Sequence, residues 1–293
     1  MKMILRTYFA IIALISLQSC GEPLAVTIKD KYVQTIPKGD RKVRIEIPEI
    51  YEMIMVVSAL TEVEQGNNLL IDTATAYYRD VRAHFKEHEK HPLVKRLNKG
   101  FGKNFWRVYS ISTLNRQGIM YDFKDGKLQN LDHYKMRWAM RTLPTPLLIF
   151  KKKKGEIEDF YQKTQFSAFY QKHKPYYDTL ISQTQQVADI DDIWQWLENN
   201  FPNRKQSYRI MTSPLLGGVH NTVQFAVKDK TWSEMVCFVS PITIQKSANP
   251  AEFKFGKQRM YVTEIDENYA KVPPQYIPDL EKAMTEVSEE KKS

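Results

Sequence analysis

Three stretches of the sequence carry residue types that could hold a metal ion or move a proton. The first, which runs from His84 to His88, fits the pattern H-x-x-E-H of one class of zinc peptidases. On a helix the two histidines lie one turn apart, so both rings could reach one metal ion. The stretch precedes Pro92, and basic side chains and histidines complement the dipole at helix ends. We therefore favour a solvated helix end over a metal site.

The second stretch is the loop Ser213–Asn221, whose two adjacent glycines permit backbone geometries that other residues resist. Here His220 could act as a ligand or a base, with Asn221 as the residue that orients it. A wide connection between two strands explains the same residues equally well. A serine nucleophile finds no support, because Ser213 precedes a proline and no serine lies in a G-x-S-x-G motif.

A third stretch, Tyr261–Tyr269, is acidic and contains Glu264, Asp266 and Glu267. An acidic first helical turn, or a loop without chemistry, is the simplest interpretation of these carboxylates. They could also bind a metal ion through oxygen, although oxygen donors favour harder ions than zinc.

Four segments together resemble an uncharacterised family of secreted bacterial proteins, which carry a domain of unknown function related to zinc metallopeptidases. The segments are residues 47–52, 85–92, 213–221 and 263–269, and the resemblance spans about residues 45 to 284. It implies that residues 263–267 correspond to an H-E-x-x-H motif. Glu264 would then match the general base, while Thr263 and Glu267 stand where the two zinc-binding histidines belong.

The two missing histidines weigh against peptidase activity. A zinc ion on one helix needs two neutral nitrogen donors at positions i and i+4, with the glutamate between them acting on the bound water. The resemblance therefore implies a metallopeptidase-like domain without the standard ligands, and we expect no cofactor. The alternative is a hydrolase that holds a metal ion with nonstandard donors such as His220, Asp266 or Glu267.

The N-terminus predicts export and lipid anchoring. Lys2 and Arg6 precede an apolar run over residues 8–17, which is short for a membrane-spanning helix. The run ends in Leu-Gln-Ser-Cys-Gly, which resembles a bacterial lipobox and would make Cys20 the lipidated first residue of the mature protein. We predict a signal peptide over residues 1–19 and a tether over residues 20–25. The alternative is an ordinary secretory signal that leaves Cys20 as a chance thiol.

Charge and cysteine content narrow the partners. Loss of Lys2 and Arg6, with no acidic residue, lowers the net charge from +9 to +7. For an exported protein this basic surface indicates envelope anions rather than nucleic acid. The run Lys151–Lys154 could touch anionic lipid or glycan, or could be a solvated loop. With Cys20 acylated, Cys237 is the one remaining thiol, and we interpret it as buried and inert rather than as a nucleophile.

Hydrophobic periodicity predicts one α+β domain over residues 26–293. Its expected order is short N-terminal strands, a large helical layer, a C-terminal antiparallel sheet and a final helix. The expected strands are residues 26–28, 43–47, 208–211, 223–227 and 235–239. The expected helices are residues 48–61, 73–89, 190–201 and 275–288, with a largely helical stretch over 92–177 that includes 134–143 and 160–173.

These observations predict a lipid-anchored envelope protein that binds a peptide or a glycan without catalysis. A metal-dependent hydrolase and a purely structural envelope component are the alternatives. The sequence leaves open which membrane holds the anchor.

Overall fold

The computed structural model describes ten parts of the chain. They are residues 26–28, 43–66, 70–102, 111, 113–131, 134–136, 149–188, 207–217, 221–226 and 233–241.

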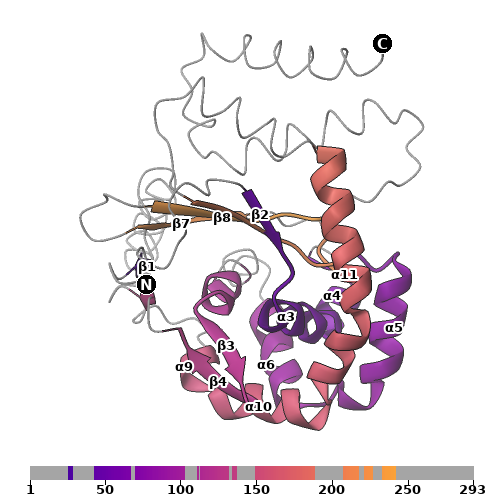
Figure 1. Cartoon of the computed structure of the whole chain (residues 1–293). Helices are drawn as coiled ribbons and strands as arrows, with labels where there is room; N and C mark the ends of the chain where they lie inside the picture. Colours follow the sequence, from indigo (N-terminus) through magenta and orange to yellow (C-terminus); the bar gives the residue numbers. More distant parts are fainter. Residues whose placement is uncertain are drawn as a thin grey trace, which may run out of the picture.

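Strands from the beginning and from the end of the described residues form one six-stranded mixed sheet (Figure 1). Its strand order is β2-β6-β8-β7-β1-β5. The strands β2, β6 and β8 run parallel, whereas β7 is antiparallel to β8, and β1 pairs parallel with β7 and antiparallel with β5. The strand bounds are β1 Val26–Ile28, β2 Val43–Glu46, β5 Tyr134–Met136, β6 Ser207–Met211, β7 Asn221–Ala226 and β8 Ser233–Phe238.

The helix α3 (Glu49–Ala59) lies at the centre of the core, beneath one face of the sheet (Figure 1). It starts directly after Pro48, whose fixed φ suits a helix start. Ten of its residues, from Ile50 to Ala59, are buried, which is typical of a helix enclosed on all sides. Tyr51 packs against Phe238 of β8, with ring centroids 5.4 Å apart. This contact fixes α3 against the sheet.

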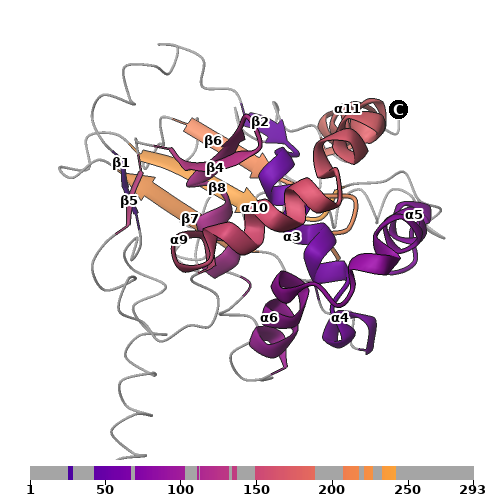
Figure 2. The ribbon, with the colours of Figure 1, turned by 90° about the horizontal axis from the view of Figure 1, so that it is seen from below.

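Further helices surround α3 and cover the same face of the sheet (Figures 1 and 2). The longest, α11 (Phe166–Ala188), runs past the β2 edge of the sheet and contacts both α3 and β2. The other bounds are α4 Glu62–Gly66, α5 Ala76–Phe85, α6 Pro92–Phe101, α9 Ile149–Lys152 and α10 Lys154–Lys163, with a short 3-10 helix η1 over Lys86–His88.

A separate hairpin, β3 (Tyr121–Lys124) and β4 (Lys127–Asn130), packs beside α10. Its two-residue turn is Asp125-Gly126, and both residues have positive φ values, 52° and 69°. An Asp-Gly pair with two positive φ angles is the favoured turn of a two-residue hairpin.

The fold is α+β, as predicted, and most of the predicted strands and helices that fall on described residues are found with small shifts of their bounds. Four details of the prediction are wrong. The predicted helix over residues 160–173 is divided into the end of α10 and the start of α11, with a break at Thr164 and Gln165. Residues 134–136 form strand β5 rather than a helix, and the stretch 92–177 contains the β3–β4 hairpin. The C-terminal strands are not an antiparallel unit, because β6 and β8 are parallel. The predicted helices at 190–201 and 275–288 lie outside the described residues.

Candidate functional site

The candidate site lies at the carboxyl ends of the parallel strands β2, β6 and β8. Backbone hydrogen bonds from Thr212 N to Glu46 O (3.0 Å) and from Val239 N to Met211 O (3.2 Å) link these strand ends to one another. The chain then enters α3 directly after β2, so that Glu52 in α3 comes beside Ser213 after β6. The carboxyl ends of parallel strands are where open α/β sheets place their ligands.

Glu52 is a fully buried carboxylate in this cluster, with 0 % of its surface exposed. The Tyr77 hydroxyl of α5 donates a hydrogen bond to Glu52 Oε1 at 2.8 Å. The same hydroxyl lies 2.5 Å from the hydroxyl of Tyr177 on α11. The buried carboxylate is thus joined by hydrogen bonds to two neighbouring helices.

Burial raises the pKa of Glu52 to about 7, because a charged carboxylate loses its hydration in the core. The nearby Ser213 hydroxyl, and then the Tyr77 hydroxyl, partly oppose this rise in pKa. Glu52 Oε2 is buried and has no hydrogen-bond partner among the described residues. We therefore take burial as the dominant effect, so that the group titrates near neutral pH.

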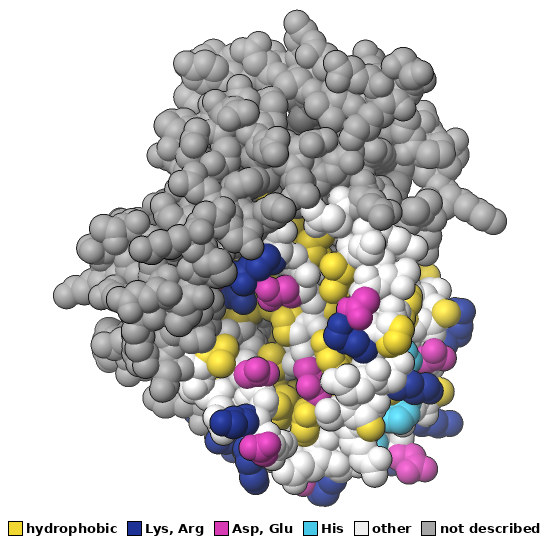
Figure 3. Space-filling view, viewed as in Figure 1, with side chains coloured by type: hydrophobic (Ala, Val, Ile, Leu, Met, Phe, Trp, Pro, Cys, Tyr) yellow, Lys and Arg dark blue, Asp and Glu magenta, His cyan; other side chains and the backbone are white. Residues whose placement is uncertain are grey.

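A surface groove of about 320 Å³ opens between the end of β2 and α11. One wall is the backbone and side chains of residues 45–48, and the other is formed by five residues of α11. Figure 3 shows hydrophobic side chains exposed between charged ones on this face of the molecule. The α11 residues are Tyr170, Lys174, Tyr177, Asp178 and Ile181. Tyr177 therefore belongs both to the groove and to the Glu52 cluster.

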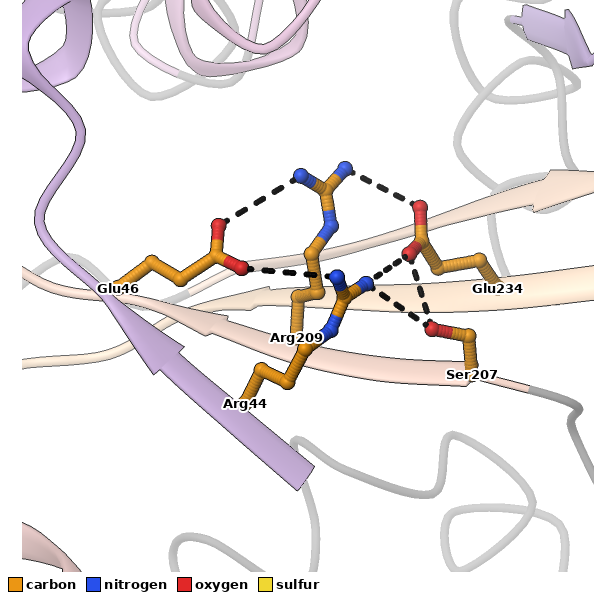
Figure 4. A network of polar contacts seen from close by, with 5 residues as sticks. All are labelled: Arg44, Glu46, Ser207, Arg209 and Glu234. Atoms are coloured by element: carbon orange, nitrogen blue, oxygen red, sulfur yellow. Dashed lines mark hydrogen bonds and ion pairs between the residues drawn. The ribbon is translucent and has the colours of Figure 1, made fainter. Parts of the chain in front are cut away.

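A network of charged side chains adjoins the groove at Glu46 (Figure 4). At its centre is the fully buried Glu234, which accepts hydrogen bonds from Arg44 at 3.1 Å, from Arg209 at 3.1 Å and from Ser207 at 3.0 Å. Both arginines also lie within 3.9 Å of the Glu46 carboxylate. The register of β2, β6 and β8 places these side chains on one face of the sheet. The network fixes Glu46 at the end of β2.

The loop that was predicted to line a site is divided by the structure. Ser213 lies beside Glu52, whereas Asn221 begins β7 and accepts a hydrogen bond from Asn115 Nδ2 at 2.8 Å. Gly217 packs against the backbone near residue 71, where an added Cβ would lie 3.0 Å from Asp72 N. That glycine is required by a close backbone approach.

The histidines of the H-x-x-E-H stretch do not share one helical turn. The helix α5 ends at Phe85, so His84 lies in α5 and His88 in η1. The His84 ring packs on Phe169 at 4.8 Å, and partial burial lowers the pKa of His84. Next to this stretch, His91 caps α6 by accepting the Leu93 N–H at 3.1 Å. Among the described residues, no three His, Cys, Asp or Glu side chains form a group suited to a metal ion.

Two lysines of the run at 151–154 pair with acidic residues of α10. Lys153 lies 3.8 Å from Glu156, and Lys154 lies 3.6 Å from Glu158. These exposed pairs indicate a solvated helix start rather than an anion-binding patch. Cys237 is fully buried in β8, as predicted.

Five of the predicted site residues lie outside the described residues. They are Cys20, His220, Glu264, Asp266 and Glu267. Sequence reasoning missed Glu52, although a signal was present. It is a lone acidic residue inside the apolar run from Ile50 to Leu60, and such a residue needs a buried partner.

No family model, curated protein or solved structure matches the chain. The resemblance to metallopeptidase-like proteins stays a prediction. In the part of the chain that the structure describes, no helix has both the length and the apolar character needed to cross a bilayer.

Proposed function

We propose that this protein is a lipid-anchored envelope protein that binds a peptide segment, without catalysis, in the groove between β2 and α11. The observation that carries the proposal is the groove itself, which combines a strand at the sheet edge, apolar side chains and charged groups at its rim.

The β2 strand supports an extended peptide as the ligand. Among the described strands, β2 has a neighbour on one side, β6, and it stands first in the strand order. A peptide that adds to a sheet edge gains main-chain hydrogen bonds, while nearby pockets take alternate side chains. In the groove, Ile45 and Ile181 offer apolar contact, and Glu46, Lys174 and Asp178 offer charged contact.

The exposure of the tyrosines favours a peptide over a glycan. Sugars stack on the open face of an aromatic ring, but in the groove Tyr170 is 9 % exposed and Tyr177 is 1 % exposed. Tyr176, which is 41 % exposed on α11, does not line the groove. The Tyr176→Ala variant therefore tests the glycan alternative: it would weaken glycan binding and leave peptide binding unchanged.

The groove is tested with peptides selected from a random library on the purified lipoprotein in detergent micelles. We expect the Ile181→Lys variant to bind the selected peptides at least about 10-fold more weakly, because it places a charge on the apolar wall of the groove. Fluorescence anisotropy gives the dissociation constants.

Two further variants control this measurement. Ser182→Lys adds the same charge at the next, exposed position of α11 and should change affinity by less than about 2-fold. Lys174→Glu reverses a charge at the rim of the groove at little structural cost, and it should also change the affinity for the selected peptides. It replaces Ile181→Lys in the test if that variant unfolds. Equal binding by all variants would contradict the groove as the binding site.

The anchor is tested separately, by metabolic labelling with an alkyne analogue of palmitate. The sequence predicts labelling of the wild-type protein, because Cys20 ends a lipobox-like signal, and loss of the label in Cys20→Ala. Cys237→Ala is the matched control, and it should keep the full label because that thiol is buried. Label that survives Cys20→Ala would refute lipid attachment at this residue.

A further inference from the structure

The peptide groove and the buried Glu52 share one side chain, Tyr177 of α11. Its hydroxyl is 2.5 Å from that of Tyr77, which donates to the Glu52 carboxylate. Tyr177 also lines the groove. A change that moves α11 away from α3 and α5 would therefore widen the groove and admit water to Glu52.

The helix α11 has a built-in weak point beside this contact. Pro175 lies inside the helix and has no N–H, so the hydrogen bond to the preceding turn is missing there. The Thr179 hydroxyl bonds to Pro175 O at 2.9 Å. The part of α11 after Pro175, which carries Tyr177 and Ile181, can thus hinge while the part before it stays packed.

We propose that a proton on Glu52 holds the second half of α11 against the core, so that loss of this proton opens that wall of the groove. This inference rests on the proposed function for its biological meaning. In the closed state the ionised carboxylate lacks a donor at Oε2 among the described residues, whereas in the open state water can hydrate it. Ionisation therefore favours opening, and protonation favours closure.

The direction of the pH effect follows from the two states. The closed state has a raised Glu52 pKa of about 7, and the open, hydrated state has the ordinary value near 4.5. Closure is therefore strongest below pH 4.5, weakens as pH rises, and reaches its lower limit above pH 7.

Other titratable groups around Glu52 do not account for this window. On α3, α5 and α11 they are tyrosines whose pKa values burial raises further, and His173 packs on the Tyr77 ring at 5.3 Å. No cationic side chain among the described residues contributes to the Glu52 pKa. His173 is therefore the group that an experiment must control for.

Hydrogen exchange of the ligand-free lipoprotein tests the proposal. We expect the protection factors of amides 177–184, corrected for intrinsic exchange, to fall roughly 100-fold between pH 5 and pH 8. Amides 169–174, before Pro175, and those of α6 serve as internal controls, and they should stay better protected than amides 177–184 at each pH, because they exchange through larger openings. The Glu52→Gln variant should lose the pH dependence, and His173→Asn should keep it.

Protection of amides 177–184 that is independent of pH, or a pH dependence that persists in Glu52→Gln, would overturn the proposal. So would equal protection of amides 177–184 and of α6 at each pH, because it would indicate that both exchange by global unfolding. The measurement needs no ligand, so a failure to select peptides would overturn the proposed function alone.

Discussion

Replacing Glu52 by Gln is expected to make the protein more stable above pH 7 and to remove most of the pH dependence of stability between pH 5 and pH 8. Burial raises the Glu52 pKa from 4.5 to about 7 in the folded state. The stability that protonated Glu52 contributes is therefore complete below pH 4.5 and is lost as pH rises through 7. The wild type should lose about 2 to 3 kcal/mol of unfolding free energy between pH 5 and pH 8.

Urea unfolding of both proteins at several pH values measures this difference. Subtracting one stability curve from the other removes the contribution of titratable groups that both proteins share. One such group is Glu156, whose pKa is lowered by an arginine and which therefore loses its stabilising charge toward acid pH. Glu64→Gln is the matched control: Glu64 is also fully buried, but accepts the backbone N–H groups of Leu70 and Ile71. It should lower stability, because it weakens the acceptor of two buried N–H groups, and it measures what the loss of a different buried carboxylate costs. Parallel wild-type and Glu52→Gln curves would contradict a raised pKa at Glu52.

The second large effect is expected at Glu234, the buried centre of the charged network. Its removal in Glu234→Ala leaves Arg209, whose side chain is 12 % exposed, without its closest carboxylate. Breaking a buried ion pair by deleting one partner costs about 3–5 kcal/mol. We therefore expect a loss of unfolding free energy of this size, measured by urea unfolding at pH 7.

Two variants show whether the loss of stability in Glu234→Ala comes from leaving the Arg209 charge without Glu234. Arg44→Ala should cost about 1 kcal/mol or less, because that side chain is 44 % exposed and Glu234 keeps Arg209 and Ser207. The double variant Glu234→Ala/Arg209→Ala should be less destabilised than the sum of its single variants. Strict additivity would show that the buried pair does not interact.

Much of the fold was predictable because its strongest elements carry their own pattern. The helix α3 follows a proline and has apolar residues at helical spacing, and β6 and β8 are short runs of strand-forming residues. The hairpin β3–β4 is harder to predict although the Asp125-Gly126 pair is a strong turn signal, because its two strands are only four residues long and lie among helical patterns.

Strand pairing and the site were less predictable, because both depend on contacts between distant parts of the chain. Parallel pairing of β2 with β6 joins residues 165 positions apart, and local periodicity does not encode such a partner. The same holds for Glu52, whose neighbours Tyr77, Tyr177 and Ser213 lie on three other segments. The sequence showed a lone acid in an apolar helix but did not show what surrounds it.

The central claim, that a peptide binds between β2 and α11, is tested most directly by mapping the amides that a selected peptide protects. Hydrogen exchange with and without the peptide, at a pH where the groove is closed, gives this map. We predict new protection at residues 43–48 of β2 and the adjoining loop and at residues 170–181 of α11, with loss of both in Ile181→Lys. Protection confined to any other part of the protein would contradict the claim.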